Sequence, residues 1–411
     1  MAKSIPQSDV LVLGQHPCAY LAADLLIQRH ARVAMHATIP GERVADRLVL
    51  INPQFFKLHK PLEKLAKKLD LMPVYGVCFL GDDATTRGEW RSKTIAAYVG
   101  CYSDIRKQLA GQAKESGAKL ITPKTLTIQR VDEKGFEVAV DAHVVRAKAV
   151  LLAGAVSSEC GKAMGLAAVG LPATGPGPIA RGATERSATG RGAMGRGEPS
   201  GEAVRDDVMR RYSFVRLKNK GVDLGPKPVI PMSLDLDKKL TWAWLLPGAD
   251  EVQLAVEQPL DQAQGAAPLH LLNRWLGVLR RHGILHLPEA VTEAQVQSID
   301  LPAAGALSRE IIANRTLLFG PAGGFYSACL EDMYPNCWSA VFAADAVDQA
   351  LKEPHLQDAL QPYRQKWGAT LGEYLRGPQQ NLRFLLPLVY RNPVMTSRMG
   401  ESILQGKSVV R

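Results

Sequence analysis

Short apolar runs and one helical repeat alternate at the start of the chain. The run Val10–Leu13 predicts a buried strand that ends at Gly14. Leucines at helical spacing over Pro17–Arg29 predict a helix, and Arg32–Met35 is typical of a second strand. Strand, glycine turn, helix and strand in this order indicate a βαβ unit, and therefore a parallel sheet.

A helix and a small antiparallel meander are expected next. Tyr102–Ser116 has a helical pattern, and Gly117 is a suitable residue to end the helix. The meander strands, which turn at Lys134-Gly135, are predicted over Leu126–Arg130, Phe136–Asp141 and Val144–Ala147. A separate buried strand over Val150–Leu152 then runs into Gly154.

The second half of the chain predicts an antiparallel sheet followed mainly by helices. The alternating strands are Tyr212–Leu217, Val229–Leu236, Leu240–Leu246 and Val252–Glu257. The later elements are a helix over Ala267–His282, a strand over Thr316–Phe319 that enters Gly320, and a helix over Tyr334–Leu351. The remainder is expected to be helical, with the apolar run Phe384–Tyr390 broken at Pro387.

Residues 171–204 differ from the rest in composition. They contain four tandem pentads with Arg181, Arg186, Arg191 and Arg196 in phase, and few large apolar residues. A period of five fits neither a helix nor a strand, and such a segment cannot bury enough surface to offset the entropy of ordering. We expect a disordered insertion, whose arginines either contact an acidic partner or phosphates or belong to a solvated linker.

The overall composition is that of a globular protein. Of 411 residues, 46% are hydrophobic and 22% are charged, which argues against a fibrous or wholly disordered chain. No apolar run approaches the length of a membrane span and no secretory signal is recognised, so we expect a cytoplasmic protein. The cysteines lack metal-binding spacing, so free thiols and no metal site are expected at Cys18, Cys78, Cys101, Cys160, Cys329 and Cys337.

The net charge of +10 reflects 50 Lys and Arg against 40 Asp and Glu. The basic residues are dispersed and no nucleic-acid-binding motif accompanies them, so no nucleic-acid partner is expected. The segment 55–69 is an exception, because Phe55, Phe56 and leucines alternate there with lysines. This basic amphipathic helix either makes a peripheral contact with an anionic membrane or packs its apolar face on the core.

Three strand-to-glycine turns bracket the expected antiparallel sheet. They lie in Val10–Ala19, Ala149–Ala155 and Thr316–Phe325, and the segment Thr241–Pro247 is an aromatic strand that ends in proline. In order and in residues, these segments resemble the flavin-dependent oxidoreductases with the group A aromatic hydroxylase architecture. Within that group the chain is most similar to the geranylgeranyl reductase branch, from Val10 to about Asp348 without the pentad insertion.

The resemblance implies an α/β fold with a three-layer, Rossmann-like FAD/NAD(P)-binding domain, an antiparallel substrate sheet and C-terminal helices. The dinucleotide-binding domain would comprise residues 1–75, 100–170 and 300–350, the substrate domain 76–99 and 205–299, the insertion 171–204, and the C-terminal helices 351–411. The positions implied to bind FAD are Gly14, His16, Pro17, Ala19, His36, Gly154, Gly320, Pro321, Ala322, Gly323 and Gly324.

The motifs depart from the family pattern where they would touch the cofactor. In G-x-G-x-x-G the second glycine lets the backbone approach the pyrophosphate, and here His16 holds that place. His36 replaces the acidic residue expected after the second strand. The other departures are Val156 and Ser157 in the middle motif, Pro321 in the third, and Glu331 and Met333 on either side of Asp332, where glycines would contact the flavin ring. The flavin-binding motifs are therefore degenerate.

Two interpretations of His16 and His36 stay open. The histidines are either a positive pair that faces a phosphate, because imidazole is readily protonated near neutral pH, or rings that fill a closed cofactor cleft. Two other features have a functional and a structural interpretation. Trp242 and Trp244 would line a substrate pocket or belong to the core, and Arg383–Arg391 would cover a lipid groove or pack as a terminal helix.

Two functions follow from the resemblance and its departures. The first is a flavin-linked oxidoreductase, similar to the geranylgeranyl reductases, that acts on an apolar substrate such as an isoprenoid or another lipid. In such an enzyme FAD supplies the hydride chemistry and the protein supplies positioning and electrostatics. The second is a non-catalytic relative that keeps the fold as a lipid-binding or protein-interaction module.

Overall fold

The computed structural model describes most of the chain. The described residues are 7–31, 34–40, 45–132, 135–154, 161, 163–166, 209–218, 222, 224–237, 241–286, 290–302, 310–376 and 382–409. The expected insertion 171–204, Val156 and Ser157 of the middle motif, and Arg32 and Val33 of the expected second strand lie outside these ranges.

The first sheet contains eight of the described strands. Its order is β17–β18–β11–β1–β2–β8, and β10 and β9 extend from the side of β11. The strands are β1 Gln7–Leu13, β2 Ala34–Ala37, β8 Lys119–Ile121, β9 Leu126–Asp132, β10 Gly135–Val140, β11 His143–Leu152, β17 Ile312–Ala313 and β18 Thr316–Leu318. β1 runs parallel to β2 and β11, and β11 runs parallel to β18. The three strands expected before glycine turns therefore lie in one sheet, and two predicted strands, Val144–Ala147 and Val150–Leu152, are one continuous strand.

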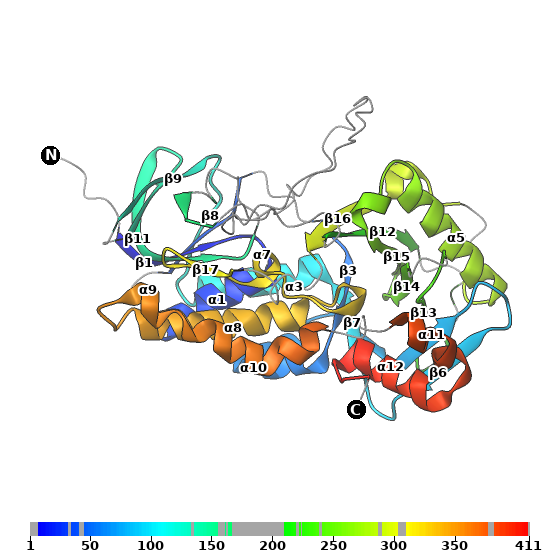
Figure 1. Ribbon diagram of the computed structural model, residues 1–411. Helices are drawn as coiled ribbons and strands as arrows, with labels where there is room; N and C mark the ends of the chain where they lie inside the picture. The colour runs from blue at the N-terminus through cyan, green and yellow to red at the C-terminus, as the bar shows by residue number, and fades with distance from the viewer. Residues whose placement is uncertain are drawn as a thin grey trace, which may run out of the picture.

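Helices cover one face of this sheet. They are α1 Pro17–Gln28, α3 Tyr102–Glu115, α7 Gly320–Gly323, α8 Met333–Ala350, α9 Leu356–Ala359 and α10 Pro362–Arg376. Helix α1 contacts both α3 and α8, and Figure 1 shows α8 and α10 on the side of the sheet opposite β9. Helices, parallel sheet and antiparallel meander confirm the three-layer α/β domain that the sequence predicts.

The second sheet contains seven described strands in the order β16–β12–β15–β14–β13–β5–β6. The strands are β5 Gly76–Leu80, β6 Arg87–Arg91, β12 Met209–Lys218, β13 Val229–Ser233, β14 Trp242–Pro247, β15 Glu251–Pro259 and β16 Gln297–Pro302. Helix α5, Ala267–Arg281, packs on β15. The expectation of a wholly antiparallel sheet is wrong at one pair, because β5 joins the free edge of β13 in parallel.

A small third sheet and a short helical segment lie between these units. The sheet has the order β3–β7–β4, with β3 Leu48–Ile51, β4 Met72–Val74 and β7 Ala97–Cys101. The segment 55–69, expected to be one helix, is instead a 3₁₀ turn η1, Pro53–Lys57, and a helix α2, Lys60–Leu65, because His59 between them is extended. Phe55, Phe56, Leu62 and Leu65 are buried in the core. This burial favours the core-packing interpretation of the segment.

The C-terminal helices α11, Leu382–Arg391, and α12, Pro393–Gln405, pack together beside β6 (Figure 1). The predicted break at Pro387 is wrong, since this residue lies inside α11. Pro387 is exposed, so the carbonyl that loses its helical hydrogen bond lies on the solvent side, where water can replace the partner. The remaining short elements are η3 Leu260–Gln262, η4 Glu293–Gln295 and η5 Ala328–Leu330.

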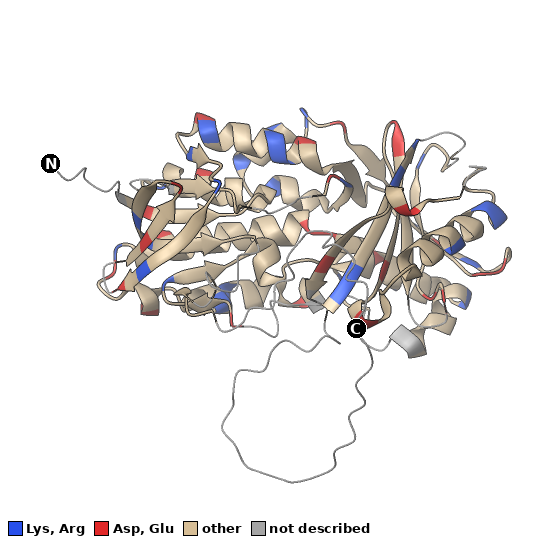
Figure 2. Cartoon of the chain, turned by 90° about the horizontal axis from the view of Figure 1, so that it is seen from above, with Lys and Arg blue, Asp and Glu red and all other residues tan. Residues whose placement is uncertain are grey.

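The distribution of charged residues and cysteines is that of a globular protein, with both signs of charge on its surface. Figure 2 shows Lys and Arg positions interspersed with Asp and Glu over both parts of the molecule. Five of the six cysteines are described; all five are free, and four of them are buried. In the described ranges no helix is long and apolar enough to cross a membrane, and no cluster of His, Cys, Asp and Glu is arranged to hold a metal ion.

Candidate functional site

Three strand ends meet at one edge of the first sheet. Leu13 at the end of β1 is paired with Leu152 of β11, and Leu152 is paired with Leu318 of β18. The glycine turns that follow these strands are therefore neighbours, and α1 and α8 begin close to them. This is the edge at which ligands of parallel α/β sheets are bound.

Two of the glycines are required by backbone geometry. Gly14 has φ +128°, and a Cβ there would lie 2.9 Å from the backbone nitrogen of Gly154. Gly320 has φ +58°, and a Cβ there would overlap Sγ of Cys18. The first glycine of the first motif and the glycine of the third motif thus keep the turns close together, whether or not a ligand is bound.

His16 caps helix α1 with its own ring. Its Nδ1 accepts a hydrogen bond from the backbone N–H of Cys18 at 3.2 Å, so the proton of the neutral ring is on Nε2. This Nε2 lies 3.3 Å from Oδ2 of Asp332, the residue immediately before α8. The ring therefore joins the N-termini of two helices that are 316 positions apart in the chain.

Two further side chains complete the contact, which we call the His16–Asp332 bridge: His16, Arg47, Asp332 and Asn336. Nη2 of Arg47 donates to Oδ2 of Asp332 at 2.5 Å, and the guanidinium lies over the ring of Tyr102, 4.2 Å from its centre. The amide of Asn336 lies 3.3 Å from Nε2 of His16. Each of the four residues is at most 4% exposed.

The charge state of the bridge follows from its burial and its partners. Burial lowers the pKa of His16 despite the nearby carboxylate, so the ring is neutral at neutral pH. Burial alone would raise the pKa of Asp332, but Arg47 and His16 outweigh burial and hold the pKa below its usual value. The bridge is therefore a buried Arg47–Asp332 ion pair to which a neutral histidine donates.

His36 is also buried rather than presented to a ligand. Its Nε2 donates to the carbonyl oxygen of Gly14 at 2.5 Å, and its ring contacts Tyr20 edge-on with 4.4 Å between ring centres. Burial lowers the pKa of His36 to about 4. Since burial lowers the pKa of both histidines, the structure favours rings that fill the cleft over a positively charged pair.

A second buried carboxyl lies beside Asp332. Oε2 of Glu331 accepts from the hydroxyl of Tyr374 at 2.7 Å, and its Oε1 accepts from the backbone N–H of Tyr334 at 3.0 Å. Asn52 in turn lies 3.4 Å from the Tyr374 hydroxyl. Burial raises the pKa of Glu331 to about 8, so the carboxyl is mostly protonated at neutral pH. It stands where the resemblance places a glycine against the flavin ring.

The other positions predicted from the motifs surround the same turns. Ala19 is fully buried, its N–H bonds to the carbonyl of His16, and Pro17 opens α1. The third-motif residues Gly320–Gly323 form the short helix α7, and Gly324 ends it with a left-handed backbone. The structure thus brings the predicted positions of all three motifs together.

The two predicted substrate tryptophans lie elsewhere, on β14 of the second sheet. Trp242 and Trp244 are 2% and 1% exposed and belong to an apolar cluster with Tyr212, Phe214 and Tyr326. They do not line either of the two pockets described in the structure. A substrate contact for them stays a prediction.

No protein-family model and no curated protein matches the sequence, but many solved structures share the fold. A geranylgeranyl bacteriochlorophyll reductase-like protein from Thermoplasma acidophilum has 14% identity and a TM-score of 0.68, covering 98% of this chain and 96% of its own. A flavoprotein/dehydrogenase from Cytophaga hutchinsonii has 14% identity, a TM-score of 0.62 and coverages of 97% and 92%. The flavin-dependent brominase Bmp2 has 14% identity, a TM-score of 0.60 and coverages of 95% and 89%. The chain therefore has the fold of the FAD-dependent oxidoreductases, as the sequence predicts.

The residues at the turns do not fit FAD in the way that the family motif requires. A pyrophosphate needs uncovered backbone amides at the N-terminus of α1, but the ring of His16 covers the amide of Cys18. The carboxylate of Asp332 faces the same helix end and would repel phosphate, and Arg47 is already engaged by Asp332. Side chains of this chain thus cover the backbone at which the motif would hold the pyrophosphate.

Sequence reasoning missed half of the bridge. Asn336 lies one helical turn after Asp332, and that spacing was the available signal for it. Arg47 lies in a stretch with no motif, and nothing in the sequence connects it with a residue 285 positions away.

Proposed function

We propose that this protein is a non-catalytic relative of the flavin-dependent oxidoreductases that uses their fold as a binding module. The observation that supports the proposal is the His16–Asp332 bridge, which joins the two helix N-termini with a buried, internally paired set of side chains. A cofactor would have to displace both the ring that caps α1 and the ion pair behind it.

A flavin-linked oxidoreductase acting on an apolar substrate is the second candidate, and one observation favours it. Three buried atoms of the bridge have no hydrogen-bond partner: Oδ1 of Asp332, Oδ1 of Asn336 and Nε of Arg47. Buried polar atoms are normally satisfied, so unpaired ones at a ligand-binding edge are groups that a ligand can pair with. The fold shared with the reductase-like and brominase structures also supports this candidate.

Flavin titration of three forms of the protein distinguishes the two functions. The forms are wild type, His16→Gly, and His16→Gly with Asp332→Asn, and the readout is quenching of FAD fluorescence. In the first variant the α1 amides are uncovered, and in the double variant the repelling carboxylate is also removed and Arg47 is released. We expect little or no binding by wild type and stepwise gains in affinity in the variants. Pro321→Asp, which restores the acidic residue of the third motif, should act in the same direction.

Two results would instead support the flavin-linked oxidoreductase. Tight binding by wild type that His16→Gly weakens by about 1–3 kcal/mol would mean that His16 donates to a phosphate. Flavin bands at about 370 and 450 nm in the purified protein would lead to the same conclusion. His282→Gly is the control, since this histidine contacts the carbonyl of Gly81 in the second sheet and should leave flavin affinity unchanged.

A further inference from the structure

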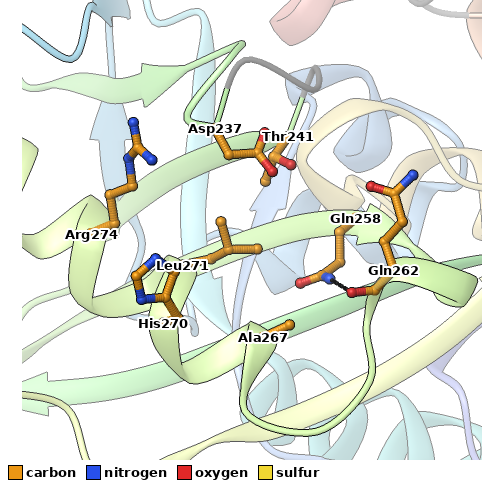
Figure 3. Close-up of a pocket in the computed structure, with 8 residues that line it drawn as sticks. All are labelled: Asp237, Thr241, Gln258, Gln262, Ala267, His270, Leu271 and Arg274. Carbon is orange, nitrogen blue, oxygen red and sulfur yellow. Dashed lines mark hydrogen bonds between the residues drawn. The ribbon is translucent and has the colours of Figure 1, made fainter.

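An open pocket of about 300 Å³ lies on the second sheet, away from the three motifs. Figure 3 shows it between the β13–β14 turn, the end of β15 and the first turns of α5. The residues that line it include Asp237, Thr241, Gln258, His270, Leu271 and Arg274. The volume is at the small end of the range for ligand pockets and is too small for a dinucleotide.

Gln258 has a buried hydrogen-bond acceptor without a partner. The residue is 3% exposed, and its Nε2 donates to the carbonyl oxygen of Gln262 at 2.8 Å. Its Oε1 is buried and has no hydrogen-bond partner. Because a buried amide oxygen is normally paired, this atom indicates a ligand that carries a hydrogen-bond donor.

The charged groups of the pocket are arranged on different sides. Figure 3 shows Asp237 and Thr241 along one rim and Gln258 beside Gln262, while His270 and Arg274 lie on the side of helix α5. Arg274 uses Nη2 to bind Oδ2 of Asp82 at 2.7 Å, which leaves its other N–H groups for a second acceptor. Leu271, which is 6% exposed, forms an apolar wall between the two sides.

We propose that this pocket binds a small zwitterionic ligand of the α-amino-acid class. Its ammonium group donates to Oε1 of Gln258. Its carboxylate accepts from Arg274 and His270 on the helix side. A ligand with only an anionic group would leave Oε1 of Gln258 unpaired, and a purely cationic one would leave the remaining N–H groups of Arg274 without an acceptor. The proposal is independent of whether FAD binds, since no residue of the three motifs takes part.

Calorimetric titration with the standard amino acids tests the proposal, with acetate and ethylamine as probes of each charge alone. We expect at least one amino acid to bind, and to bind about tenfold more tightly than either single-charge probe. No binding by any amino acid, or equal binding of acetate, would overturn the assignment. Flavin is absent from this experiment, so its failure is distinct from failure of the function proposed above.

Variants of Gln258 identify the atom responsible. Gln258→Leu removes the acceptor and should weaken amino-acid binding by about tenfold. Gln258→Glu keeps an acceptor for the ammonium but loses the donor to the carbonyl of Gln262, and it should bind more tightly than Gln258→Leu, so a poorly folded Leu variant does not leave the question open. Gln297→Leu is the matched control, because Gln297 is exposed on β16 of the same sheet outside the pocket. Equal affinities of Gln258→Leu, Gln258→Glu and Gln297→Leu would contradict the proposal.

Discussion

The edge of the first sheet and the pocket on the second sheet differ in whether their buried polar groups are paired. At the first, Asp332 is buried and receives both Arg47 and His16, so the chain's own side chains neutralise one another. At the second, Gln258 is equally buried and lines the pocket, but its Oε1 has no hydrogen-bond partner. A shared fold does not by itself place a ligand, so the pairing of the buried polar groups is the feature by which these two regions can be compared.

Removing Arg47 should produce the largest effect, because it leaves a buried carboxylate without its cation. We expect Arg47→Ala to lower the free energy of unfolding by about 3–5 kcal/mol, the usual cost of breaking a buried ion pair. Urea denaturation followed by circular dichroism measures it. Arg216→Ala is the control: Arg216 pairs with Asp46 and Glu251, whose side chains are 46% and 27% exposed, and its loss should cost about 1 kcal/mol or less. Equal losses of unfolding free energy in the two variants would show that the buried ion pair of Arg47 stabilises the protein no more than the surface ion pairs of Arg216.

The second prediction concerns how Glu331 makes the free energy of unfolding depend on pH. Its pKa is about 8 in the folded protein against an ordinary value of 4.5, so the folded state binds this proton more tightly than the unfolded state. Its contribution to stability is complete below about pH 4.5, declines as the pH rises, and is lost above about pH 8. We expect Glu331→Gln, which cannot ionise, to remove this decline and to gain on the order of 4 kcal/mol relative to wild type at alkaline pH.

Denaturation midpoints measured from about pH 5 to pH 9 check the Glu331 prediction. Glu115→Gln on the exposed side of α3 is the control and should keep the wild-type pH dependence. A parallel pH profile for wild type and Glu331→Gln would show that Glu331 does not titrate in this range, and the interior of the first region would then be less completely enclosed than its burial indicates.

The smallest effect is expected in the pocket. Gln258→Leu removes one hydrogen bond, to the carbonyl of Gln262, but also removes an acceptor that has no partner. We expect the free energy of unfolding to change by about 1 kcal/mol or less, as thermal denaturation without amino acid can measure. A loss as large as that of Arg47→Ala would mean that Gln258 supports the sheet rather than a ligand.

The sequence predicted the elements that depend on local pattern. Buried runs before Gly14, Gly154 and Gly320 fixed three parallel strands, because a fully buried strand is apolar at every position. The parallel pairing of β5 with β13 was not predictable, since the apolar pattern of a strand does not specify which distant edge it joins. His59 has an extended backbone within the segment 55–69, and its Nε2 lies 3.7 Å from the carboxylate of the buried Asp24, a tertiary proximity that helical periodicity does not reveal.

The candidate site was likewise predictable from the sequence only in part. His16 stood out because the motif assigns glycine to that place, and the departure led to the hypothesis of a filled cleft, which the buried ring favours and flavin titration tests. Its partners could not be derived, because Arg47 and Asp332 meet only after β3 and α8 have packed on the first sheet. Position in a motif is local information, whereas the identity of a buried partner is a property of the folded chain.

The parallel pair of β5 and β13 has a consequence for the order in which the molecule assembles. Gly76 of β5 pairs with Val229 of β13, so β5 and β6 leave the ribosome as a hairpin whose outer edge stays open until β13 is synthesised. All five residues of β5 are buried in the finished protein, which makes that open edge both apolar and able to pair with another chain. Nascent chains that stall before Val229 should therefore depend on chaperones, and a fragment truncated there should aggregate while the complete chain does not.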